Sequence, residues 1–167
     1  MWNTFWPDLL VTVIGAALTV AIAFGTYVVQ RRVKERLALQ KLIAVIHEKR
    51  AVEPIVGPQL MSGAGGLEDF QYVSSSILDL RDQIGLAREQ VRPESPVQPH
   101  LSRMTRACNR YLESSSQRPA GYCYDLVSLR EALWVSIKKI SELSRSLEAL
   151  EPGVGARDYD VEQMDLS

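Results

Sequence analysis

The 167-residue sequence is poor in the side chains that hold metals or form disulfides, since it has only two cysteines and two histidines. Two cysteines cannot build a disulfide framework, and together with two distant histidines they lack the spacing of a structural zinc site. We expect Cys108 and Cys123 to be free thiols in a reducing compartment. His47 and His100 have no neighbouring nucleophile or orienting carboxylate in the sequence. The sequence therefore predicts no metal, no cofactor and no enzyme activity.

An excess of either charge is also lacking, because 19 Lys and Arg residues face 20 Asp and Glu residues. Residues 51–150 contain eleven basic and twelve acidic side chains, a balance that argues against nucleic-acid binding. Arg103, Arg106 and Arg110 nevertheless recur at a spacing that places them on one helix face. This stripe is either a solvated face or a contact stripe for phosphate, lipid headgroups or an acidic partner.

Charge is absent altogether from residues 9–29. As a helix, these 21 residues span about 30 Å, the thickness of a bilayer's hydrocarbon core. Trp2 and Trp6 would lie at one membrane interface, where aromatic side chains are enriched. The sequence thus predicts a transmembrane helix over 9–29, preceded by a short external N-terminus over 1–8.

A cleaved signal peptide is the competing interpretation, because Ala21-Ile22-Ala23 mimics a cleavage site. However, the first eight residues contain no lysine or arginine, and apolar residues continue to Val29. The basic residues come after the apolar run. These features favour a retained membrane span.

The orientation of the span follows from the basic residues that come after it. Residues 31–50 contain seven basic and two acidic side chains, and those nearest the membrane are Arg31, Arg32, Lys34 and Arg36. Because positive charge is retained on the cytoplasmic side, the N-terminus is expected outside and the remainder in the cytoplasm. We therefore expect a single-pass protein of the plasma (inner) membrane, with these four side chains at the lipid interface.

The N-terminal segment also carries a resemblance. The run Phe5-Trp6-Pro7-Asp8-Leu9-Leu10-Val11-Thr12-Val13-Ile14-Gly15, followed by an arginine-rich helix, resembles the start of many small, uncharacterised single-span bacterial membrane proteins. The resemblance covers about the first fifty residues. It implies the single-span topology and no activity.

Within the span, small side chains recur every fourth residue at Ala17, Ala21 and Gly25. This arrangement lets two spanning helices approach closely, but alanine and glycine are common in spans. Thr12, Thr19 and Thr26 form a row spaced by seven residues. Their hydroxyls could line a polar path or bond to carbonyl groups of their own helix.

The rest of the chain has the periodicity of helices throughout and of strands nowhere. A basic juxtamembrane helix is predicted over 30–53, followed by a Pro/Gly linker over 54–66 and an antiparallel helical bundle over 67–150. Its three helices are expected at 67–91, 100–115 and 124–150. The stripe of Leu39, Leu42, Ile43 and Ile46 could add a fourth helix. The acidic tail over 151–167 is expected to be disordered.

Two of these helices carry apolar seams with alternating steps of three and four residues, the spacing of coiled-coil packing. The first seam is Phe70, Val73, Ile77, Leu80, Ile84, Ala87 and Val91. The second is Leu126, Leu129, Leu133, Ser136, Ile140, Leu143, Leu147 and Leu150. Because the loops between the helices are short, both seams can face one core.

These features predict an all-α, membrane-tethered and non-enzymatic interaction module that holds or regulates a cytoplasmic partner. The alternative is a membrane effector, of the toxin or phage-defence type, that oligomerises through its span and perturbs the bilayer. The small residues of the span favour the alternative. In either case the expected partners are the lipid bilayer and a protein or a second copy of the chain.

Overall fold

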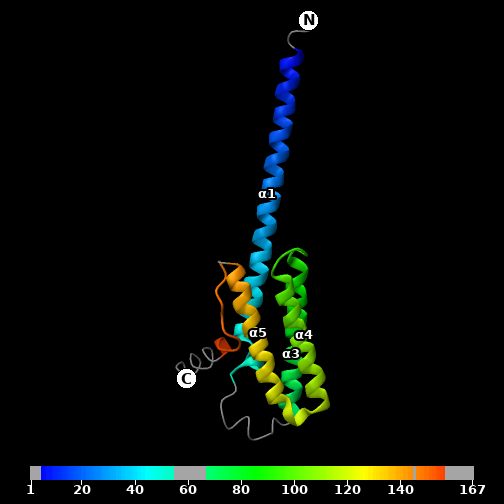
Figure 1. Ribbon diagram of the computed structural model, residues 1–167, viewed down its shortest axis with the longest axis vertical. Coiled ribbons are helices and arrows are strands. Elements are labelled where there is room, and N and C mark those ends of the chain that lie inside the picture. The colour runs from blue at the N-terminus through cyan, green and yellow to red at the C-terminus, as the bar shows by residue number, and fades with distance from the viewer. Residues whose placement is uncertain (1–4, 55–66, 145, 157–167) are drawn as a thin grey trace, which may run out of the picture. The chain divides into compact units, whose positions relative to one another are not determined.

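The computed structural model describes residues 5–54, 67–144 and 146–156, without the side chains of residues 5–12, 67 and 68 (Figure 1). All regular elements within these residues are helical. They are α1 (Phe5–Glu48), η1 (Arg50–Val52), α3 (Leu67–Gln90), α4 (Gln98–Gln117), η2 (Pro119–Gly121) and α5 (Tyr122–Leu143). The predicted all-α class is thus confirmed for the described residues. The predicted linker beyond Pro54 and the tail beyond Ala156 lie outside them.

The chain divides into two units, residues 1–35 and residues 36–167. In the first unit, α1 forms one uninterrupted helix through the apolar run. Its side chains from Val13 to Tyr27 are all exposed. This unit contributes no residue between Val13 and Lys34 to the hydrophobic core.

The second unit, residues 36–167, has a single hydrophobic core to which four helices contribute. The C-terminal part of α1 supplies Leu39, Leu42, Ile43 and Ile46, all of which are at most 3% exposed. Their spacing places them on one face of the helix, so the whole stripe can be buried together. This part of α1 therefore packs with the remaining helices.

The first predicted seam, on α3, meets the buried face of α4 in this core. Ile77, Leu80 and Ile84 of α3 are fully buried, as are Leu101 and Met104 of α4. Helix α4 packs against both α3 and α5, and the three helices lie side by side (Figure 1). The short turn at η2 returns the chain directly from α4 to α5.

The predicted helix over 124–150 is wrong at its C-terminal end, because α5 ends at Leu143. Ser144 has φ −120°, outside the helical range, while its N–H still donates to the carbonyl of Ile140. Leu143 is 48% exposed although the seam predicts it to be buried. Leu147 is buried, but it reaches the core from a turn in which its N–H donates to the Ser144 carbonyl.

The prediction that disorder begins at residue 151 is also wrong for the residues that the structure describes. Pro152, Gly153 and Gly155 are buried, and the N–H of Gly153 donates to the carbonyl of Ile46 at 3.1 Å. We call residues 146–156 the C-terminal strap. Composition did not predict it, because residues 151–156 have few large apolar side chains and are fixed by contacts with residues far away in the sequence. Before them, Leu147 belongs to the core, and Ala149 and Leu150 pack against it.

Candidate functional site

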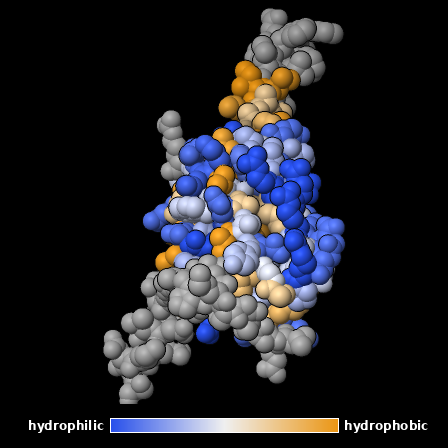
Figure 2. All heavy atoms as spheres, turned by 60° about the horizontal axis from the view of Figure 1, so that its bottom comes forward, coloured by the Kyte–Doolittle hydropathy of each residue, from blue (hydrophilic) through white to orange (hydrophobic). Residues whose placement is uncertain are grey.

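The described residues contain one helix, Val13–Glu48, that is long and apolar enough to cross a bilayer. None of its most apolar stretch is buried within the molecule. Val20, Ile22 and Phe24 are each 67–68% exposed, and Figure 2 shows the described side chains next to the grey N-terminal residues mostly as hydrophobic. An apolar helix of a water-soluble core would instead be covered by neighbours.

The residues predicted for the membrane interface are only partly described. Trp2 and the side chain of Trp6 lie outside the described residues. Arg31, Arg32 and Lys34 are exposed. Arg36 is exposed too, but its guanidinium donates to the carbonyl of Ser146 in the strap at 3.2 Å. Arg36 therefore has a structural contact that the charge pattern did not predict.

The small residues of the span present an open surface. Ala17, Ala21 and Gly25 are exposed, and no atom lies within 4 Å of a Cβ placed on Gly25. The hydroxyls of Thr19 and Thr26 donate to the carbonyls of the residues four positions earlier, each at 2.9 Å. These two hydroxyls are satisfied by their own helix and do not line a polar path. The side chain of Thr12 lies outside the described residues.

The predicted arginine stripe lies on α4. Arg103, Arg106 and Arg110 are exposed, whereas Leu101 and Met104 of the same helix are buried. No acidic side chain of the described residues forms an ion pair with them. The stripe is thus available for contact with a partner, and its role stays a prediction.

The isolated cysteines and histidines occupy different surroundings. Both cysteines are free thiols, and burial raises the pKa of Cys108 to about 12, so this thiol stays protonated at neutral pH. The Nδ1 atom of His100 is buried and has no partner in the described part of the chain. Burial, followed by the charges of Arg103 and Lys139, lowers the pKa of His100. These environments activate neither residue as a nucleophile.

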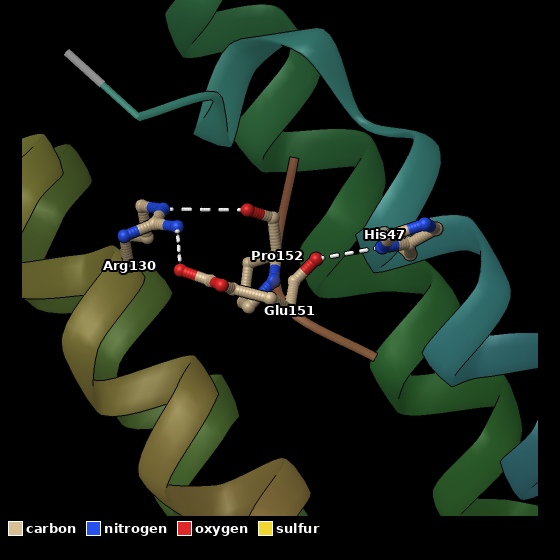
Figure 3. A network of polar contacts seen from close by, with 4 residues as sticks. All are labelled: His47, Arg130, Glu151 and Pro152. Carbon is tan, nitrogen blue, oxygen red and sulfur yellow. Dashed lines mark hydrogen bonds and ion pairs between the residues drawn. The ribbon is translucent and has the colours of Figure 1, made fainter. Parts of the chain in front are cut away.

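His47 takes part in a polar network with the strap, which Figure 3 shows. Nδ1 of His47 lies 2.7 Å from the carbonyl oxygen of Glu151. On the other side of the strap, Nε of Arg130 donates to the carbonyl of Pro152 at 3.3 Å, and its guanidinium pairs with the Glu151 carboxylate. The strap therefore connects the end of α1 with α5.

Two glycines let the strap approach α1 and η1 closely. Gly153 has φ +73°, and a Cβ there would lie 2.4 Å from the carbonyl oxygen of Val52. A Cβ on Gly155 would lie 2.6 Å from Cδ2 of His47. Sequence reasoning missed this site, although the pattern Pro152-Gly153-Val154-Gly155 is a local signal for a tight backbone path.

Comparisons with models of protein families, with curated proteins and with solved structures give no match for this chain.

Proposed function

We propose that the chain is a single-span membrane protein whose N-terminus lies outside and whose residues 36–156 form a cytoplasmic helical bundle that holds or regulates a protein partner without catalysis. The observation that carries the proposal is the exposure of the apolar part of α1. Eight large apolar side chains between residues 13 and 29 are more than half exposed: Val13, Ile14, Leu18, Val20, Ile22, Phe24, Tyr27 and Val29. Lipid would cover this apolar surface, and the apolar segment is long enough to cross one bilayer.

The orientation is supported by the exposed cations that follow the span. Arg31, Arg32 and Lys34 are all exposed and can extend their charged ends toward lipid headgroups. Residues 1–8 contain only one ionisable side chain, that of Asp8. This asymmetry favours a cytoplasmic location for everything after α1 leaves the membrane.

Retention in the membrane tests the first part of the proposal. After washing at alkaline pH, the full chain should stay with the membrane fraction. Val20→Arg with Ile22→Arg should move a large share of the protein out of that fraction, because each charge near the bilayer centre costs about 3 kcal/mol. Val20→Leu with Ile22→Leu is the matched control and should stay in the membrane. Release of the unmodified chain by the wash would exclude the span.

The tether function is tested by co-purification from crosslinked cells. We propose the stripe of Arg103, Arg106 and Arg110 as the partner contact, because it is exposed and unpaired within the described residues. Reversal of all three charges to glutamate should remove a specific crosslinked protein. As a matched control, Glu113, Glu131 and Glu148, which are also exposed, are replaced by lysine. This variant should still yield the same crosslinked protein. If the same protein is still crosslinked to the variant with all three arginines reversed, the stripe is not the partner contact.

The membrane effector remains the second candidate, and the open surface at Ala17, Ala21 and Gly25 favours it. Close approach of two such surfaces would allow spans to associate. The bonded hydroxyls of Thr19 and Thr26 weigh against a water-filled path. If the chain is an effector, its overproduction should collapse the membrane potential, and Ala21→Leu should abolish this effect without preventing insertion. An unchanged membrane potential would exclude this candidate.

A further inference from the structure

Besides the burial of Leu147 and the packing of Ala149 and Leu150 on the core, the strap is held by polar contacts with its backbone. The Glu151 carbonyl accepts from Nδ1 of His47, because a carbonyl oxygen can only accept. The Pro152 carbonyl accepts from Nε of Arg130, and the Gly153 N–H donates to the carbonyl of Ile46. Three consecutive residues thus have a main-chain group bonded to α1 or α5. Main-chain hydrogen bonds of this kind contribute to the binding of peptide segments by proteins.

Other contacts select particular residues within the strap. The guanidinium of Arg130 pairs with the carboxylate of Glu151, so an acidic residue is favoured there. At position 153 the positive φ and the nearby Val52 carbonyl leave room only for glycine. At position 155 a Cβ would lie 2.6 Å from Cδ2 of His47, so a larger residue there requires the His47 ring to shift. Pro152, between Glu151 and Gly153, is buried. These contacts require glycine at position 153 and favour the pattern acidic–Pro–Gly–x–Gly around it.

We propose that the surface formed by His47, Val52 and Arg130 is a peptide-binding site that residues 151–156 occupy in cis as a turn, and that it can bind an acidic–Pro–Gly–x–Gly turn segment of a partner protein once the strap is released. The proposal uses only contacts within residues 36–156. It holds whether or not α1 crosses a membrane, and it names a partner class that the proposed tether function leaves open.

Release of the strap is consistent with the contacts that hold it. In the Arg130–Glu151 pair, the two side chains are 22% and 48% exposed, so water and salt weaken their attraction. Leu147, the strap residue in the hydrophobic core, lies four residues before the peptide pattern begins, and Ala149 and Leu150 next to the pattern are only partly buried. Because the strap belongs to the same chain, its effective concentration is high, and a peptide in trans competes only when the strap is weakened.

Gly153→Ala is the variant that weakens the strap selectively. The added Cβ would collide with the Val52 carbonyl, and alanine disfavours the positive φ of this position. Gly85→Ala is the matched control, because no atom lies within 4 Å of a Cβ at that helical position. Hydrogen exchange of the full-length chain in detergent should show lost protection at residues 146–156 in Gly153→Ala alone, with α3, α4 and the first turns of α5 still protected.

The binding measurement uses a fluorescent synthetic peptide with the sequence of residues 149–156. Its affinity for full-length Gly153→Ala should exceed that for the parent and for Gly85→Ala by at least about tenfold, the equivalent of about 1.4 kcal/mol. Adding Arg130→Gln to Gly153→Ala should remove this gain. A peptide with glutamine in place of its glutamate, or alanine in place of its first glycine, should bind at least about tenfold more weakly.

Three results would overturn the proposal. If the strap loses protection in Gly153→Ala but the peptide shows no saturable binding, the surface is not a peptide site. If α3 and α4 lose protection together with the strap, the strap is an integral part of the core and not a releasable occupant. If the strap keeps its protection, the steric role assigned to Gly153 is wrong and the selectivity derived from it fails.

Discussion

Among single residues, Leu80 and Leu78 offer a direct comparison of buried and exposed positions on α3. Leu80 is fully buried in the core, whereas Leu78 is 41% exposed. Leu80→Asp would place an unpaired charge among apolar side chains and should lower the free energy of unfolding by more than about 3 kcal/mol. Leu78→Asp should change it by about 0.5 kcal/mol. Denaturant unfolding of the full-length chain in detergent, followed by circular dichroism, measures both, and equal losses would show that the seam has been misassigned.

His100 makes stability depend on pH. Burial, then the charges of Arg103 and Lys139, lower its pKa from the ordinary 6.5, although Glu142 raises it slightly. The unfolded chain therefore binds the proton more readily, so this contribution to stability is present above pH 6.5 and is lost as the pH falls through the lowered value. Melting temperatures between about pH 7.5 and pH 5 should fall more in the parent than in His100→Gln. Equal slopes in the two proteins would contradict this origin.

Residue spacing predicted the stripe of Leu39, Leu42, Ile43 and Ile46, which is buried in the structure, because helical periodicity is a local property. It could not predict the partners of His47. The Glu151 carbonyl lies 104 positions away in the sequence, and only the folded chain brings the two together. For the same reason, the charge pattern, which placed Arg36 at the membrane interface, could not predict its contact with Ser146.

At the scale of elements, α3 contains a glycine that its packing does not require. Gly85 lies within the helix, and a Cβ there would meet no atom within 4 Å. Gly85→Ala should raise the free energy of unfolding by about 0.5–1 kcal/mol, because alanine loses less backbone entropy in a helix. Denaturant unfolding checks this change. A decrease in stability would mean that the groove beside Gly85, lined by Arg81, Leu86 and Thr105, is tighter in solution.

The end of α5 shows where periodicity stops being a guide to an element. Steps of three and four residues continue through Leu143, Leu147 and Leu150, yet the helix ends at Leu143. Apolar spacing indicates which side chains would share a face if the segment were a helix. It does not determine whether the backbone is helical. Here the chain must turn so that the strap can reach Arg130 and the carbonyl of Ile46, and these long-range contacts are invisible to a local pattern.

For the whole molecule, the distribution of charge along α1 should set the orientation in the membrane. Replacing Arg31, Arg32 and Lys34 with glutamine should give a mixed population in which part of the protein has its C-terminal unit outside, because the positive charge that retains this unit is reduced. The matched control replaces Arg103, Arg106 and Arg110 with glutamine, which removes the same charge far from the span. Protease protection in sealed vesicles measures the two populations, and an equal effect in both variants would contradict the assignment.

The apolar run and the all-helical class could be predicted from the sequence because both arise from composition and spacing. The way in which residues 151–156 bind to the helices could not be predicted, since it depends on a positive φ at Gly153 and on His47 of α1 and Arg130 of α5. From the exposed apolar surface of α1 we propose membrane insertion with the N-terminus outside.

Labelling of single cysteines in intact cells tests that claim most directly. In a chain in which Cys108 and Cys123 are replaced by alanine and serine, a cysteine is placed either at Asn3 or at Ser128, which is exposed on α5. A membrane-impermeant maleimide should label Asn3→Cys in intact cells and Ser128→Cys only after the cells are opened. Labelling of Ser128→Cys in intact cells, or loss of the Asn3→Cys segment from the mature protein, would contradict a retained span with its N-terminus outside.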